Sequence, residues 1–217
     1  GNRGAHMTKM LAAMFQGTLV SLEIFLLTLV FALPLALPAA FARMSRNRLA
    51  SGLTNGYLLV MRGTPLILQL IFVYFAPFYL LGISFNRFVA VIVAYVLNYA
   101  AYFAEIYRGG IESIPAGQYE AAKVLGFTRA QTFFRIVLPQ VVKRIIPASG
   151  NEVITLVKDT ALAQTIGVAE LFRTAQNASA RQFSTMPIFV AGVFYFVMNW
   201  VVSLVFARIE KKLSYYR

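Results

Sequence analysis

The chain of 217 residues contains no cysteine and only one histidine, His6. Without cysteine it can form no disulfide framework, no thiolate metal site and no cysteine nucleophile. Residues 1–6, which precede Met7, are interpreted as the remnant of an expression tag, so His6 carries no functional weight. Neither a serine–histidine–aspartate set nor a cluster with metal-ligand spacing can then be assembled, and we expect no metal site.

A phosphate-binding loop of the form Gly-x-x-x-x-Gly-Lys-Ser/Thr is also missing. The chain is therefore not expected to bind ATP in the usual way, to need a cofactor or to act as an enzyme on its own. Acidic residues are scarce, with 8 Asp and Glu against 20 Lys and Arg. In an apolar chain such an excess is typical of loops held on the cytoplasmic side, so we expect no nucleic-acid partner.

The residues that are abundant are apolar: 59% of the chain is hydrophobic and only 13% is charged. This composition predicts an all-α integral membrane protein with a single domain over residues 7–217, because backbone groups in lipid must be paired within a segment. A span takes about 20 helical residues. Five runs reach or approach that length, and the fourth is the shortest and most polar: about 18–42, 56–81, 87–107, 141–158 and 186–208.

The basic residues predict how these five spans are oriented. They gather after the first span, between the third and fourth, and at the chain's end, as in Arg43, Arg108, Lys123, Arg129, Arg135, Lys143, Arg144, Arg208, Lys211 and Arg217. The connections on the opposite side hold fewer. The positive-inside rule therefore puts the N-terminus outside and the C-terminus in the cytoplasm.

The cytoplasmic segment between spans three and four has the sequence of a helical hairpin. Pro115 is suited to open a helix over 116–125, and Gly126 is suited to end it in a left-handed conformation. Residues 128–131 form a capping box that starts a second short helix, which we expect Pro139 to stop.

The first hairpin helix has the features of a docking element. Ala116, Ala121 and Ala122 are small enough to let a partner's backbone approach, and Glu120 offers a fixed charge. The alternative is a helical loop that lies in the lipid headgroups, tethered by its basic residues.

The hairpin resembles the signature of permease subunits of bacterial ATP-binding-cassette (ABC) importers. The spacing and identity agree throughout, at Glu120, Ala121, Ala122, Gly126, Ile136, Leu138 and Pro139. Residues 62–65, the stretch from Asn151 to Thr160 and the five-span layout are similar to the polar amino acid branch of that family. The resemblance covers nearly everything from Thr18 onward.

The resemblance implies a location, a set of partners and a role for the hairpin. The chain would be a single permease domain in the bacterial inner membrane, with a coupling hairpin over about 108–140. Residues Ala116, Glu120, Ala121, Ala122 and Gly126 would couple it to separate ABC ATPase subunits. A second permease subunit, identical or paralogous, would complete the path, and an extracytoplasmic binding protein would deliver an amino acid.

Polar residues inside the spans are the candidates for lining that path, because they are expensive in lipid. Asn98, Tyr102 and Glu105 share one face of the third span. A second set of polar residues lies along one face of the fourth span and at its end: Asn151, Glu152, Thr155, Lys158 and Asp159. They are either interhelical contacts, as favoured for Glu105 with Arg62, or ligands of a substrate.

We expect the substrate to be bound by Asn98, Tyr102, Asn151, Glu152 and Thr155. A carboxylate at Glu152 favours a cationic amino acid such as arginine, lysine or histidine. The alternatives are an importer for glutamine or glutamate, or a stand-alone secondary transporter that needs no ATPase.

Overall fold

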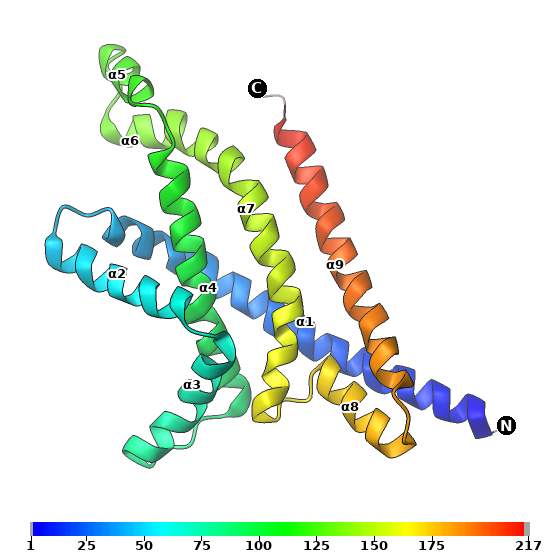
Figure 1. The fold of residues 1–217 in the computed structure, drawn as a ribbon. Helices are drawn as coiled ribbons and strands as arrows, with labels where there is room; N and C mark the ends of the chain where they lie inside the picture. The colour runs from blue at the N-terminus through cyan, green and yellow to red at the C-terminus, as the bar shows by residue number, and fades with distance from the viewer. Residues whose placement is uncertain (1, 215–217) are drawn as a thin grey trace.

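The computed structural model describes residues 2–214, and Gly1 of the expected tag remnant and residues 215–217 of the expected domain lie outside them. Within the described residues every element is a helix, which agrees with the predicted all-α class (Figure 1). The order is α1 (Asn2–Arg43), α2 (Arg48–Gly63), α3 (Leu66–Leu81), α4 (Arg87–Glu112), α5 (Ala116–Val124), α6 (Arg129–Thr132), the π-helical η1 (Phe133–Val137), α7 (Leu138–Asp159), the 3₁₀ segment η2 (Thr160–Ile166), α8 (Leu171–Gln182) and α9 (Met186–Leu213).

The core forms where α1, α4 and α7 meet, with α9 packed on α7. On α1, three alanines four residues apart, Ala32, Ala36 and Ala40, are almost fully buried. On α4, Ala94, Ala101 and three other alanines are buried in the same cluster. Small side chains let helix backbones approach closely, which is how membrane helices gain contact where no hydrophobic driving force remains.

The predicted second span, 56–81, is wrong as a single helix. The chain breaks between Gly63 and Leu66, and α2 and α3 meet at a bend of 111°. Pro65, in extended conformation, stands before α3. A proline removes one backbone donor and disfavours helix in the residue before it, so Thr64 is extended as well.

The number of spans is supported in part. Three helices, α1, α4 and α9, are long and apolar enough to cross a membrane, and α2 with α3 qualify only as one bent pair. Helix α7 matches the predicted fourth span and has 22 residues, but is more polar. The count of five therefore stays a prediction.

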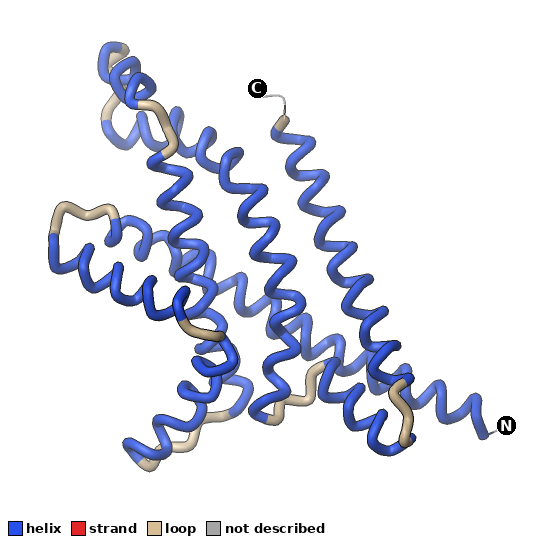
Figure 2. The backbone as a smooth tube through the Cα atoms, viewed as in Figure 1, coloured by secondary structure: helices blue, strands red, loops and turns tan. Residues whose placement is uncertain are grey.

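Two ends of the molecule can be followed in the backbone trace. Helices α5 and α6 and the last turns of α9 lie at one end, whereas α8, the loop before α4 and the first turns of α1 lie at the other (Figure 2). The basic residues of the hairpin and those of the last turn of α9 therefore lie at the same end, and the orientation stays a prediction.

Candidate functional site

The hairpin between α4 and α7 is built largely as its sequence predicts. Pro115 stands directly before α5, and Gly126 adopts the left-handed conformation with φ of 77°. The Thr128 hydroxyl accepts a hydrogen bond from the Gln131 backbone, and the Gln131 side chain accepts one from the Thr128 backbone. This reciprocal capping box fixes where the second helix starts.

Pro139 does not stop that helix, so this expectation is wrong. The chain runs on through η1 into α7, and Pro139 occupies the first turn of α7. The backbone N–H of Leu138 bonds the carbonyl of Phe133, five residues earlier. This wider π-turn accommodates a proline that cannot donate, and a first-turn proline costs little.

The side chains of α5 divide into an exposed set and one buried residue. Ala116, Glu120 and Ala121 are exposed, whereas Ala122 is fully buried within this chain and supports the hairpin from inside. Two apolar side chains that the sequence argument did not single out, Val124 and Leu125, are 87% and 72% exposed. The sequence did contain a signal for them, because two large apolar residues stand directly before Gly126 in an otherwise polar segment.

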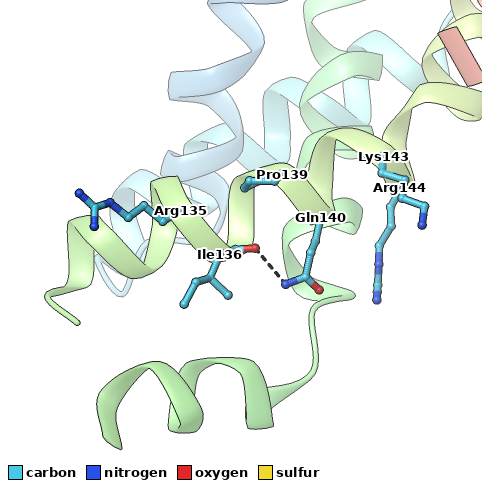
Figure 3. Close-up of a pocket in the computed structure, with 6 residues that line it drawn as sticks. All are labelled: Arg135, Ile136, Pro139, Gln140, Lys143 and Arg144. Atoms are coloured by element: carbon cyan, nitrogen blue, oxygen red, sulfur yellow. Dashed lines mark hydrogen bonds between the residues drawn. The ribbon is translucent and has the colours of Figure 1, made fainter. Parts of the chain in front are cut away.

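The hairpin is tied to the spans on both sides. Gln140 of α7 donates to the Gln118 side chain of α5 over 3.1 Å, and the Arg144 guanidinium donates to the backbone oxygen and hydroxyl of Ser113. A hollow of about 560 Å³ lies here, with Arg135 at one end and Lys143 and Arg144 at the other (Figure 3). These contacts join α5 to α7, and the end of α4 to α7.

Among the polar residues of the predicted substrate path, Arg62 and Glu105 form the interhelical contact that the sequence analysis favoured. The Arg62 and Glu105 side chains approach to 3.9 Å, while Arg108 makes the closer pair with Glu105 at 2.6 Å. The Arg62 guanidinium lies 5.9 Å from the centre of the Tyr102 ring, close enough for a cation–π contact. Tyr102, a candidate substrate ligand, is half-buried, and the Arg62 guanidinium lies beside its ring.

Asn98 lies at the helix break rather than in an open cavity. Its side-chain nitrogen donates to the Met61 carbonyl at 3.2 Å and to the Gln69 side chain at 2.9 Å, and Asn98 is buried. Gln69 in turn donates to the carbonyls of Met61 and Thr64. Sequence reasoning missed Gln69, although a glutamine inside an apolar run was a visible signal.

These two amides satisfy carbonyls that the break between α2 and α3 leaves without helical partners. Replacing Gln69 by Leu should lower the free energy of unfolding by about 1–3 kcal/mol for each buried group left unpaired. Thermal unfolding of the purified protein in detergent measures this, with exposed Gln16→Leu as the matched control. Equal midpoints for both variants would contradict a structural role for Gln69.

On α7 the candidates lie partly outside the core. Asn151 and Thr155 are exposed, and Glu152 is half-buried. Glu152 and Asp159 are seven residues apart and so share a helix face. Asp159 accepts a 2.6 Å hydrogen bond from the Tyr99 hydroxyl of α4. Glu152 therefore lies on the side of α7 that turns toward α4.

Glu170 is a second residue that the sequence argument missed. Its side chain is fully buried in front of α8 and accepts hydrogen bonds from two backbone N–H groups and the Tyr195 hydroxyl. Burial raises the pKa of the Glu170 carboxyl above its ordinary value, and the hydrogen bonds oppose that rise.

The comparisons with known proteins agree with this geometry. A family model described as the inner membrane component of binding-protein-dependent transport systems matches residues 32–215. An L-cystine transport system permease of Bacillus subtilis, TcyB, is 39% identical over 202 residues, covering 92% of this chain and 86% of its own. The arginine transport system permease ArtQ of the same species is 36% identical over 200 residues, covering 92% and 91%. A Rickettsia felis protein named as a glutamine transport system permease is 35% identical over 199 residues, covering 91% of each.

Solved structures show the same fold. A crystal structure described as an amino acid ABC transporter with histidines aligns with a TM-score of 0.88 and 32% identity, over 95% of this chain and 96% of that one. An inward-facing methionine ABC transporter, MetNI, aligns with a TM-score of 0.73 at 18% identity, over 95% of this chain and 97% of that one, which supports the fold alone. The resemblance to ABC permeases is therefore confirmed, and the chain belongs to the family of inner membrane components of binding-protein-dependent transport systems.

Proposed function

We propose that the chain is the membrane-spanning subunit of an ATP-driven importer for a cationic amino acid. The observation that carries this proposal is the capped hairpin, which presents Glu120, Val124 and Leu125 to solvent at one end of the molecule. An ordered, exposed element with apolar residues at its tip is a surface that a partner covers. The family relationship supports an ATPase as that partner.

The ATPase subunits dock on residues 116–126 and supply the hydrolysis that this chain does not perform. Closure of two ATPase subunits on ATP moves α5, and the contacts of Gln118 and Ser113 with α7 pass that movement to the spans. Ala122 and Gly126 hold the shape of the docking element, one by packing and one by its left-handed backbone.

A second permease subunit completes the path. Asn151, Thr155 and Lys158 are exposed along one side of α7, within the predicted fourth span. Polar side chains in spans face a bundle interior or water rather than lipid. This side of α7 therefore faces a partner subunit across a shared, hydrated path.

The substrate is a cationic amino acid. Glu152 is half-buried with no ion-pair partner among residues 4–214, so a substrate guanidinium or ammonium is well suited to neutralise it. Tyr102, Asn151 and Thr155 provide hydrogen bonds to the rest of the molecule. Asn98 contributes its side-chain oxygen, because its nitrogen already bonds Gln69 and Met61.

The second candidate function is import of glutamine or glutamate. It is favoured by relatives that are named as glutamine permeases and share about a third of their residues with this chain. In that case Glu152 shapes the pocket by accepting hydrogen bonds and contributes no charge contact.

The orientation is N-terminus outside and C-terminus in the cytoplasm. Cysteine placed at exposed Ser45 should react with an impermeant thiol reagent only from the cytoplasmic side, and cysteine at exposed Ser84 only from outside. The chain has no cysteine of its own, so each label reports one position. Labelling of Ser45→Cys in intact cells would invert the orientation and remove the case for an ATPase at the hairpin.

Co-purification tests the ATPase partnership. The wild-type chain should retain a co-expressed ABC ATPase through affinity purification, whereas the Glu120→Arg, Leu125→Glu double variant should lose it while staying in the membrane. Equal retention by both would contradict docking at α5.

A further inference from the structure

The hollow of about 560 Å³ beside η1 and the first turns of α7 has a lining rich in basic side chains (Figure 3). The residues that line it are Arg135, Ile136, Pro139, Gln140, Lys143 and Arg144. They occur as neighbouring pairs that recur every four residues, so they share one side of the continuous helix. A hollow of this volume is large enough for a small molecule or a lipid headgroup.

The charge that lines this hollow is positive throughout. The carboxylates at this end of the molecule are Glu105 and Glu112 of α4, Glu120 of α5 and Glu210 of α9, and none of them lines the hollow. Arg108 forms ion pairs with both carboxylates of α4. Among residues 2–214 neither Arg135 nor Arg144 forms an ion pair. The hollow is therefore suited to an anion.

The arginines have hydrogen-bond donors to offer such an anion. Arg144 uses its Nη1 atom to bond the backbone oxygen and the hydroxyl of Ser113. A guanidinium carries five N–H donors, so the other donors of Arg144 remain for a ligand. The side chain of Arg135 is exposed. Arginine is the side chain best suited to bind phosphate, because its donors match two phosphate oxygens at once.

The basic residues lie at two ends of the hollow rather than at one point. Arg135 lies at one end, and Lys143 and Arg144 lie at the other (Figure 3). Positions 135 and 144 are separated by about 13 Å along the helix, at 1.5 Å per residue. A ligand with two phosphate groups can engage both ends at the same time, which favours it over a ligand with one.

The hollow also lies where α7 enters the predicted fourth span. Lys143 and Arg144 fall inside residues 141–158, whereas Arg135 precedes them. Phe134 and Val142, which adjoin lining residues in the sequence, are 65% and 37% exposed. Basic residues beside exposed apolar ones are typical of a surface at the membrane interface. Basic pockets beside membrane helices on the cytoplasmic side bind the headgroups of anionic lipids such as cardiolipin, which carries two phosphates.

We propose that this hollow binds the headgroup of a lipid with two phosphates, of the cardiolipin type. One phosphate lies against Arg135 and the other against Lys143 and Arg144, and an acyl chain runs along α7 past Val142. The lipid then adjoins both contacts that join the hairpin to α7, Gln140 with Gln118 and Arg144 with Ser113. This inference goes beyond the proposed function, because it requires insertion in a membrane but no particular substrate.

Native mass spectrometry of the purified full-length chain in detergent measures the Kd of added lipids. Cardiolipin should bind with a Kd at least tenfold below that of phosphatidylcholine, which has no net charge. Arg135→Gln with Lys143→Gln leaves the contact of Arg144 with Ser113 in place and should raise the cardiolipin Kd at least tenfold. Arg135→Glu alone, at an exposed position, should change the Kd in the same direction.

The matched control removes the same charge elsewhere at this end of the molecule. Arg208 and Lys211 are exposed on the last turns of α9 and do not line the hollow. Arg208→Gln with Lys211→Gln should therefore bind cardiolipin with the wild-type Kd. An equal rise of the Kd in this control would reduce the binding to a general attraction between basic residues and anionic lipid, and would overturn the site.

Two further measurements distinguish the lipid from other occupants. Pyrophosphate, a soluble probe with two phosphates, should not displace cardiolipin at equal concentration, and displacement would assign the hollow to a soluble anion. Cardiolipin should remain bound when the ATPase is added, and its release would assign the hollow to that protein. A chain that transports its substrate but binds cardiolipin no better than phosphatidylcholine would overturn this inference and leave the importer proposal standing.

Discussion

Reversing one charge on the hairpin, Glu120→Arg, is expected to abolish binding-protein-stimulated ATP hydrolysis while membrane insertion stays intact. Glu120 is exposed on α5 and makes no side-chain hydrogen bond or ion pair within residues 2–214, so we attribute the loss to the docking surface. Proteoliposomes that contain the complete complex measure both hydrolysis and uptake. Glu210→Arg is the matched control, because Glu210 is exposed on α9 near the end that we expect in the cytoplasm.

Gly126→Leu is also expected to abolish binding-protein-stimulated ATP hydrolysis, because it changes the backbone of the hairpin rather than its charge. Its backbone φ of 77° is unfavourable for a residue with a side chain, so leucine alters the turn that aims α5. Gly126→Asn should retain far more activity, since asparagine tolerates this conformation. If Glu120→Arg and Gly126→Leu both transport at wild-type rates, coupling through this hairpin is wrong.

The second large effect concerns substrate. Glu152→Gln keeps the size and hydrogen bonding of the side chain and removes its charge. Uptake of arginine or lysine at limiting concentration should fall about tenfold or more, because a hydrogen bond to a charged group contributes about 1.5–3 kcal/mol. The same variant with glutamine as substrate provides the control and should change little. Unchanged arginine uptake, or a wild-type preference for glutamine or glutamate, would contradict the cationic assignment.

The hairpin was predictable because its signals are local. Pro115, Gly126 and the Thr128–Gln131 box each act within a few residues of themselves, so short-range rules suffice. Pro139 shows the limit of such rules. A proline is tolerated where a π-turn removes the need for its N–H, and that turn depends on how η1 packs.

The break between α2 and α3 was missed because hydropathy averages over a long window. Residues 56–81 are apolar enough to read as one span, although Gly63 and Pro65 mark the break. Part of what stabilises the break is distant in sequence: Asn98 of α4 donates to the Met61 carbonyl, which also accepts from the nearby Gln69. The same holds for Glu170, whose partners Ser21 and Tyr195 come from other helices.

Uptake into proteoliposomes tests the central claim most directly. The vesicles contain this chain with its ABC ATPase, ATP inside and a substrate-loaded binding protein outside. We predict accumulation of arginine or lysine that requires both ATP and the binding protein and stops with an ATPase variant that cannot hydrolyse ATP. Accumulation by this chain alone, driven by an ion gradient with no ATP present, would contradict the account.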